Sequence, residues 1–440
     1  MSIKIGMVSL GCAKNAVDAE VMLGALVDSG CEITPDAEAA DIIIVNTCGF
    51  IDAAKRESIE AILDMAKMKQ TGRCKRLIVS GCLSERYIKD LPELMPEVDA
   101  FLGVGQSAGI ADIIKEVEEG RRVIESGLPD THYNAMKRVL TTPWYTAYVK
   151  IAEGCDNCCT YCAIPSIRGG YVSAPEEDVL SELERLAEAG VKEAVLVAQD
   201  TTRYGEDIYG ERRLADLLEK ACEIDGIDWL RVLYCYPERV DKRLLDVMAR
   251  QPKILKYIDL PMQHADNGIL KAMNRANTRE SMQRLMDDIR GYDCGFVVRT
   301  SLISGFPGED EKAHEALLEF IKHNRIERIG AFEFSREEGT PAYSMPQVHW
   351  KTKKRRHRAV MELAREISRE FNSSRVGDEV MVLCEGFDEE RGLFYGRSFA
   401  EAPDADGKVY FTAKEFTPGE FTRVRILSAG DYDITGEADL

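Results

Sequence analysis

The sequence lacks any apolar run approaching the roughly 18 residues that a membrane-spanning helix needs. The apolar stretch before Cys12 is far too short for a secretory signal, although the residues leading into Cys12 superficially resemble a lipoprotein cleavage site. Internal repeats and low-complexity tracts are also missing. We therefore expect a cytoplasmic protein with no membrane partner.

Positive charge is in deficit, because 57 Lys and Arg stand against 76 Asp and Glu and give a formal net charge of −19. Such a balance disfavours a polyphosphate partner and suits a basic one. The 13 cysteines are odd in number and come without an export signal, which argues against a disulfide framework and for metal ligands mixed with buried thiols. A length of 440 residues predicts two or three domains.

The first 130 residues alternate apolar strands with helices, which predicts a parallel sheet covered on both faces. Strands are predicted at 4–10, 41–46 and 76–80, with helices at 16–28 and 53–67. A cysteine follows each of these strands, namely Cys12, Cys48 and Cys82, hereafter the sheet trio. Because the carboxyl ends of parallel strands share one edge, the three thiols are expected in one crevice. The alternative is three unrelated thiols in a core, since cysteine is often buried.

A second cysteine group has the spacing C-x3-C-x2-C at Cys155, Cys159 and Cys162, hereafter the loop trio. Thiolates clustered in one loop suit iron in a sulfide cluster, and three of them leave one iron of a four-iron cube open to a cofactor or substrate. Cys158 lies outside this spacing and is treated as a bystander. The alternatives are a zinc knot or buried thiols, but no fourth Cys or His stands at a distance that structural zinc would need.

The rest of the chain predicts two further domains. Strands at 145–151, 194–198, 229–234, 257–260, 296–302 and 329–334, with helices between them, indicate a partial (β/α)6 barrel of the TIM-like kind. A helix at 350–371 follows, and alternating stretches such as 379–383 and 421–427 then predict a small antiparallel β-barrel. The predicted fold class is α/β, with domains at 1–135, 141–371 and 373–440.

The motifs resemble those of the methylthiotransferases within the radical S-adenosylmethionine (SAM) superfamily. The loop trio, with Tyr161 before its last cysteine, resembles the superfamily signature, and the segments around the sheet trio resemble the amino-terminal domain of the methylthiotransferases. Residues 260–264 and 304–309 resemble the barrel motifs of that family, and the last 65 or so residues resemble its TRAM-like β-barrel. The resemblance thus extends over essentially the whole chain.

This resemblance implies two 4Fe–4S clusters, with SAM serving as radical source and as methyl donor. The loop trio would hold the cluster that chelates SAM, and the sheet trio would hold a second cluster that supplies or carries the sulfur. It further implies an electron donor such as a flavodoxin or ferredoxin. Tyr161 is a candidate cofactor contact beside the loop trio. Gln199, Arg299 and Ser301, at the carboxyl ends of barrel strands, could also reach the cofactor, with ordinary loop solvation or structural hydrogen bonding as the alternative. No catalytic side chain is assigned.

Two branches of the family differ in substrate: one modifies an aspartate β-carbon in ribosomal small-subunit protein twelve, the other an adenosine in transfer RNA. From residue 373 to the end, seven Lys or Arg face fifteen Asp or Glu, a balance of −8 that suits a basic ribosomal protein, free or within the small subunit. The sequences of residues 162–169 and 198–205 also resemble the ribosomal-protein branch. The basic run at 351–358 is the main argument for transfer RNA. A non-catalytic iron–sulfur carrier or sensor is the alternative from another class.

Overall fold

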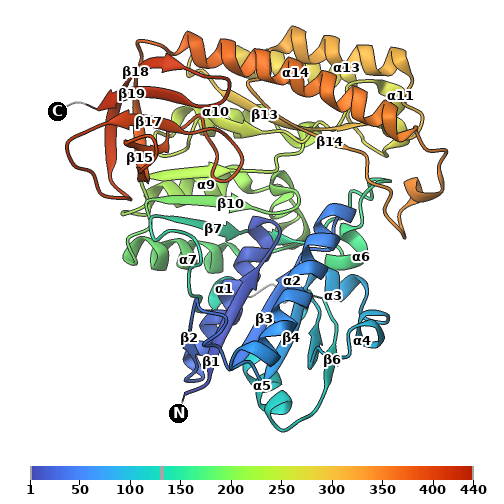
Figure 1. Ribbon diagram of the computed structural model, residues 1–440. Helices are drawn as coiled ribbons and strands as arrows, with labels where there is room; N and C mark the ends of the chain where they lie inside the picture. The colour runs from blue at the N-terminus through green and yellow to red at the C-terminus, as the bar shows by residue number, and fades with distance from the viewer. Residues whose placement is uncertain (1, 129–132, 439–440) are drawn as a thin grey trace.

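The computed structural model describes residues 2–128 and 133–438. Figure 1 shows an amino-terminal sheet domain, a central partial barrel and a small carboxy-terminal barrel, which confirms the predicted fold class. Within the described ranges, no helix has the length and apolar character needed to cross a membrane.

Six parallel strands form the amino-terminal sheet in the order β2-β1-β3-β4-β5-β6. Its elements are β1 (Lys4–Ser9), α1 (Ala13–Asp28), β2 (Glu32–Ile33), β3 (Ile42–Thr47), α2 (Asp52–Thr71), β4 (Arg76–Gly81), α3 (Cys82–Arg86), α4 (Leu91–Leu94), β5 (Ala100–Leu102), α5 (Ile110–Glu118) and β6 (Val123–Glu125). Every residue of β3 is buried because helices cover both faces of the sheet, which explains its apolar sequence. The strands missed from sequence are two or three residues long, too short to show a pattern.

The central domain contains all six predicted strands, arranged as two adjoining parallel sheets, β11-β10-β7 and β12-β13-β14. The strands are β7 (Thr146–Lys150), β10 (Glu193–Val197), β11 (Trp229–Val232), β12 (Tyr257–Asp259), β13 (Val297–Ser304) and β14 (Arg328–Glu333), with a short pair β8 (Ala152–Glu153) and β9 (Val172–Ser173). The helices are α6 (Ile164–Arg168), α7 (Glu176–Glu188), α8 (Glu206–Tyr209), α9 (Leu214–Glu223), α10 (Lys242–Arg250), α11 (Asn267–Ala272), α12 (Arg279–Arg290), α13 (Glu311–Asn324) and α14 (Trp350–Ser374). The barrel is incomplete, because β7 and β14 are not paired with each other.

The carboxy-terminal domain is a closed five-stranded barrel in the order β15-β16-β17-β19-β18. Its strands are β15 (Glu379–Asp388), β16 (Leu393–Arg397), β17 (Val409–Thr412), β18 (Phe421–Ala429) and β19 (Ile434–Ala438). Four of its pairings are antiparallel, as predicted, whereas β17 and β19 run parallel. An odd number of strands cannot alternate in direction around a closed ring, so one parallel pairing is unavoidable.

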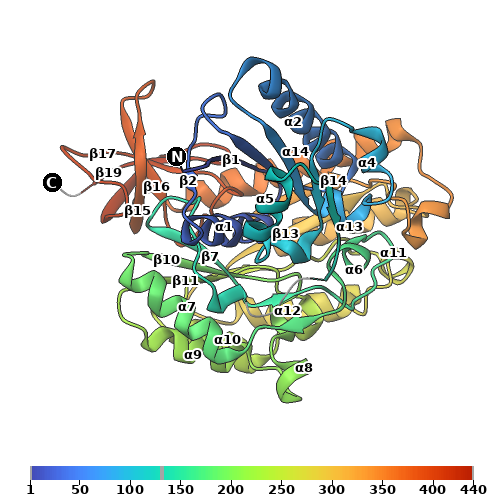
Figure 2. The same ribbon diagram turned by 90° about the horizontal axis from the view of Figure 1, so that it is seen from below.

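Helix α1 joins the amino-terminal domain to the barrel, where it packs against β7 (Figures 1 and 2). Met22 belongs to the core of the amino-terminal sheet, while Val21 belongs to the core of the barrel. Gly24 is required at its position because a Cβ there would lie 2.2 Å from the backbone oxygen of Lys137 in the connecting segment. The helix is therefore buried on most sides and fixes the sheet edge against the barrel.

The segment 398–408, between β16 and β17, packs into the barrel. Ala400 and Ala402 share a buried apolar cluster with Tyr148 and Tyr257 of the barrel strands. The hydroxyl of Tyr257 donates to a carboxylate of this segment, Asp406, at 2.6 Å. The carboxy-terminal domain is thus part of the wall of the central domain.

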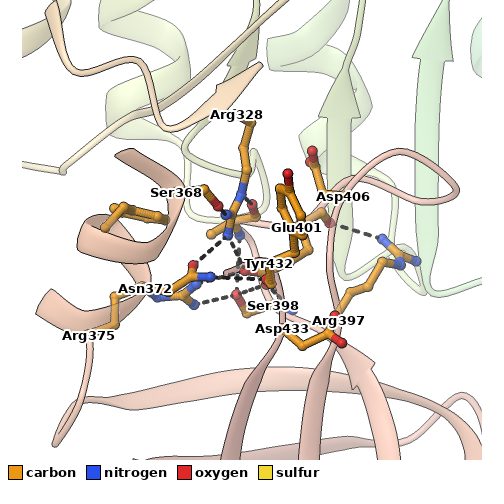
Figure 3. Close-up of polar contacts among 12 residues, drawn as sticks. Arg328, Ser368, Asn372, Arg375, Arg397, Ser398, Glu401, Asp406, Tyr432 and Asp433 are labelled. Carbon is orange, nitrogen blue, oxygen red and sulfur yellow. Dashed lines mark hydrogen bonds and ion pairs between the residues drawn. The ribbon is translucent and has the colours of Figure 1, made fainter. Parts of the chain in front are cut away.

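Buried ion pairs secure this junction (Figure 3). Glu401 accepts from Arg328 of β14 at 3.0 Å and from Arg375, after α14, at 2.7 Å, and the Glu401 side chain is about 1% exposed. Although burial favours the neutral acid, the two guanidinium groups hold the pKa of Glu401 at about 2. Arg328 also donates hydrogen bonds to the side-chain oxygens of Ser368 and Asn372, both on α14. One carboxylate therefore pairs with two buried cations from different parts of the chain.

We expect Glu401→Gln to lower the melting temperature by about 5 °C or more, because breaking a buried pair leaves uncompensated charge and costs about 3 kcal/mol. Scanning calorimetry of the full-length protein measures this. Glu390→Gln, at an exposed position of the same domain, is the matched control and should melt with the wild type. Equal melting temperatures for Glu401→Gln and wild type would contradict the structural role of the pair.

Candidate iron–sulfur site

The loop trio lies in the loop between β8 and α6, beyond the carboxyl end of β7. Cys155 and Cys159 are buried and Cys162 is half-buried. Backbone hydrogen bonds hold the loop: the amide of Cys155 donates to the Gly169 oxygen at 3.1 Å, and that of Cys162 to the Cys159 oxygen at 3.0 Å. The three thiols therefore occupy defined positions at the mouth of the barrel.

Hydrogen-bond donors are directed at two of these sulfur atoms. Asn157 Nδ2 donates to Cys155 Sγ, and the backbone amide of Ile164 donates to Cys162 Sγ, both at 3.4 Å. Asn157 is itself held by Asp200 at 3.0 Å and by Arg239 at 2.9 Å. N–H groups aimed at sulfur stabilise thiolates that are bound to iron.

The sheet trio converges from three strand ends, as predicted for a parallel sheet. Cys12 precedes α1, Cys48 follows β3, and Cys82 begins α3 after β4. The loops meet closely: a Cβ on Gly11 would lie 2.9 Å from Cys48 Cβ, and one on Gly49 would lie 2.8 Å from the carbonyl carbon of Cys82. Glycine beside two of the cysteines is what allows the three segments to approach.

The donor atoms of both trios suit an iron–sulfur cluster, because all six side chains are thiols. Across residues 2–128 and 133–438, no three His, Cys, Asp or Glu side chains lie close enough together to hold one metal ion. A single ion draws its ligands within about 2.3 Å of one centre, whereas an iron–sulfur cube has thiolates on separate corners and keeps them further apart. Each trio nonetheless forms one electrostatic group, in which the charges of its cysteines act on one another. Burial raises the pKa of Cys82 to about 11 and that of Cys162 to about 12, so iron must displace protons when it binds.

The two trios are neighbours. Cys82 packs in an apolar cluster with Ala163 and Ile167. Ala163 follows Cys162 directly and precedes α6, and Ile167 lies within α6. Arg168, the last residue of α6, donates from Nη2 to Cys82 Sγ at 3.4 Å. Sequence analysis missed Arg168, because nothing in the spacing of a single arginine tells that it is buried beside a distant cysteine.

A cavity of about 740 Å³ opens beside Cys12. Its walls include Tyr234 and Arg299 from the barrel and Asp404 from the carboxy-terminal domain. All three parts of the chain therefore contribute to one chamber that reaches a cysteine of the sheet trio.

The four candidate cofactor contacts lie in different surroundings. Arg299 lines the cavity beside Cys12 and pairs with Asp259 at 2.8 Å. Gln199 donates to Glu153 at 2.9 Å, and its buried Oε1 has no hydrogen-bond partner among the described residues.

Tyr161 stacks edge-on against Phe306 with ring centres 6.4 Å apart. Ser301 is half-buried on β13, and its backbone oxygen accepts from the amide of Gln263 at 2.9 Å. The orphaned oxygen of Gln199 is the feature that best fits a missing ligand. All four assignments remain predictions.

Three parts of the chain match known families. Residues 4–103 match the family described as Uncharacterized protein family UPF0004, residues 149–321 match the Radical SAM superfamily, and residues 376–438 match the TRAM domain. Fold and site together define an enzyme of the radical SAM class, which uses an iron–sulfur cluster and SAM.

Similar proteins of full length narrow this class. The ribosomal protein uS12 methylthiotransferase RimO of Caldicellulosiruptor saccharolyticus is 48% identical, and the alignment covers 99% of both chains. The protein of the same name from Pelotomaculum thermopropionicum is 48% identical, with 100% of both chains covered. The chain belongs to the ribosomal protein uS12 methylthiotransferase family, a family of transferases, and the resemblance drawn from the motifs is confirmed.

Solved structures share the fold at low identity. The radical SAM methyltransferase TsrM from Kitasatospora setae, with cobalamin and a 4Fe–4S cluster bound, matches with a TM-score of 0.59 and 15% identity, over 78% of this chain and 74% of that chain. The cobalamin-dependent radical enzyme OxsB matches with a TM-score of 0.50 and 11% identity, over 83% of this chain and 56% of that chain. These likenesses show a common architecture.

Iron analysis tests both trios. We expect about eight iron atoms in the wild-type chain after anaerobic reconstitution, and about four in either Cys159→Ala or Cys48→Ala, because each trio is predicted to hold one cube. Cys158→Ala is the control within the same loop and should keep the full iron content, since Cys158 is exposed. Full iron content in Cys48→Ala would contradict the role of the sheet trio.

Proposed function

We propose that this chain inserts a methylthio group at the β-carbon of an aspartate in ribosomal protein uS12. The observation that carries the proposal is the match, over nearly the whole length, to relatives named as uS12 methylthiotransferases. The structure supports it because Cys82 of the sheet trio packs against α6, which follows the loop trio, and because a cavity large enough for a side chain and a cofactor opens beside Cys12.

In this proposal the loop trio holds the cluster that binds SAM, and the sheet trio holds the second cluster. When bound, these cofactors would supply the radical chemistry, the sulfur and the methyl group. The protein binds and orients them: Asn157 and the Ile164 amide hold the sulfur atoms of the loop trio. An electron must enter from another protein, for which a flavodoxin or ferredoxin is proposed.

The aromatic residues beside the loop trio would exclude water from the reaction. Arg275 lies 4.2 Å from the ring centre of Tyr236, and its charge also acts on Tyr161 and Cys159. Tyr236 and Arg275 are buried and Tyr161 is half-buried, so these side chains limit the access of water to the cysteine loop.

Three of the six cations in the basic run at 351–358 are bonded inside the protein, which weakens the transfer-RNA alternative. Arg355 binds Glu311 through both nitrogens at 3.1 and 2.7 Å, and Arg356 is buried and donates to the backbone oxygen of Glu309 at 2.7 Å. Lys353 donates to the oxygen of Phe334 at 3.0 Å. These cations hold α14 against the barrel and are therefore not free to neutralise phosphates.

A basic polypeptide fits the entrance of the chamber better. Asp404 is exposed, and it lines both the cavity beside Cys12 and an adjoining cavity of about 470 Å³ that also contains Glu385. The two cavities form a path from the carboxy-terminal domain to the sheet trio. We propose that uS12 reaches the site along this path, which would place the reaction in the cytoplasm.

Mass spectrometry decides between the substrates. Cells without this chain should lose the methylthio group from uS12 and keep it on transfer RNA. Loss from transfer RNA alone would assign the chain to the other branch. No loss from either, combined with no release of 5′-deoxyadenosine by the purified protein, would favour the carrier or sensor alternative.

We expect Cys159→Ala to abolish SAM cleavage, and Cys48→Ala to leave cleavage measurable while sulfur insertion is lost, because the trios hold different cofactors. Chromatography of 5′-deoxyadenosine and mass spectrometry of uS12 measure the two steps separately. Absence of cleavage in both variants would contradict this division.

We expect Asp404→Asn to weaken binding of uS12 about fivefold at low salt, because one charge near a basic partner contributes about 1 kcal/mol. Asparagine keeps an acceptor for the Tyr148 hydroxyl, which lies 3.1 Å from Asp404, and tolerates the positive φ of 59° at this position. Fluorescence anisotropy with labelled uS12 gives the dissociation constants. Glu415→Gln, at an exposed acid outside the cavity walls, is the control.

A further inference from the structure

Arg168 occupies a position between the two cysteine trios. It is 2% exposed and ends the short helix α6, which begins two residues after Cys162. Its Nη2 lies 3.4 Å from Cys82 Sγ and 2.9 Å from Asp18 Oδ2, and its Nη1 lies 2.9 Å from Glu153 Oε2. One guanidinium therefore contacts a ligand of the sheet trio and a residue adjacent to the loop trio.

The surrounding charges form a closed ring. Lys150 Nζ lies 2.5 Å from Asp18 Oδ1 and 2.7 Å from Glu153 Oε2, so two cations alternate with two carboxylates. All four residues are buried. Asp18 belongs to α1, which starts after Cys12, while Glu153 lies two residues before Cys155. The ring thus connects the segments that present cysteines from both trios.

The two positive and two negative charges of this ring balance one another, yet Arg168 also directs one N–H at the sulfur of Cys82. Buried charges are screened weakly, so a cation 3.4 Å from a ligand sulfur acts strongly on that ligand. A positive charge and an N–H donor favour the cluster oxidation state that carries more negative charge. Arg168 is therefore placed to influence a redox property, in addition to the packing of two domains.

We propose that Arg168 is a positioning residue shared by both cysteine sites, which fixes the sheet trio against α6 and raises the reduction potential of the cluster held there. This rests on the proposed function in one respect, namely that the sheet trio holds a cluster. No catalytic contact with substrate is assigned to Arg168.

The test uses the full-length chain with Cys155, Cys159 and Cys162 all changed to alanine, so that only the sheet trio can hold iron. The one-electron reduction of its cluster is followed by electron paramagnetic resonance during titration with dithionite. In this background Arg168→Gln should lower the equilibrium constant for reduction about tenfold, which corresponds to a potential about 59 mV more negative. Arg168→Lys keeps the charge and should change the constant less than about threefold.

Arg138→Gln is the matched control. Arg138 is also buried and also bridges the two domains, since it pairs with Glu20 of α1 at 3.0 Å and with Glu182 of α7 at 2.9 Å, but no hydrogen bond joins it to a cysteine in the described structure. Its loss should leave the potential unchanged. An equal shift in Arg138→Gln and Arg168→Gln would mean that loosened domain packing causes both and would overturn the proposal.

Asp18→Asn provides a test of opposite sign, which remains informative if Arg168→Gln does not fold. Removing a carboxylate that now neutralises Arg168 should make the potential more positive. An unchanged potential in Asp18→Asn, or in a fully iron-loaded Arg168→Gln, refutes the inference. Absence of any iron in the triple-alanine background would instead refute the assignment of a cluster to the sheet trio, and with it the proposed function.

Discussion

The structure depends on the pairing of buried charges at the junctions of an incomplete barrel. Two sheets that do not close leave an open side and an uncovered end, and the other two domains cover them with polar as well as apolar side chains. Each buried cation then needs an anion from another part of the chain. For example, Arg397 of the carboxy-terminal barrel pairs with Glu193 of β10 at 2.6 Å. Because removing one partner leaves an unpaired charge in the interior, these contacts make the three parts mutually dependent.

The sequence predicts the fold, and the convergence of the sheet trio at one edge of the sheet, for physical reasons that are local. Strands such as β3 are buried on both faces and therefore read as continuous apolar runs, and α14 shows helical periodicity over its full length. The C-x3-C-x2-C spacing lies in one loop, so its geometry is contained in the sequence itself. The sheet trio is predictable because parallel strands end at one edge.

Other features depend on distant contacts and leave no local pattern. The proximity of Arg168 to Cys82 requires the packing of α6 on α3, across 86 positions of the chain. The segment 398–408 reads as an ordinary polar loop, although it covers part of the barrel. Net charge also misleads in detail: Glu401 and Glu385 count toward the acidic balance of the carboxy-terminal domain, yet both are bonded to arginines within the protein. Because Arg375 and Arg397 are themselves counted in that balance, the pairing leaves the net charge of the domain unchanged but makes these two carboxylates unavailable to a partner.

Because residues 402–405 form part of the chamber wall, the order of translation determines when the chamber can form. The sheet trio is translated before the central barrel, whereas the pocket beside Cys12 is closed by a segment that is translated after that barrel. The amino-terminal domain can therefore fold before its chamber exists, and the chamber wall is completed only when residues 402–405 reach the barrel.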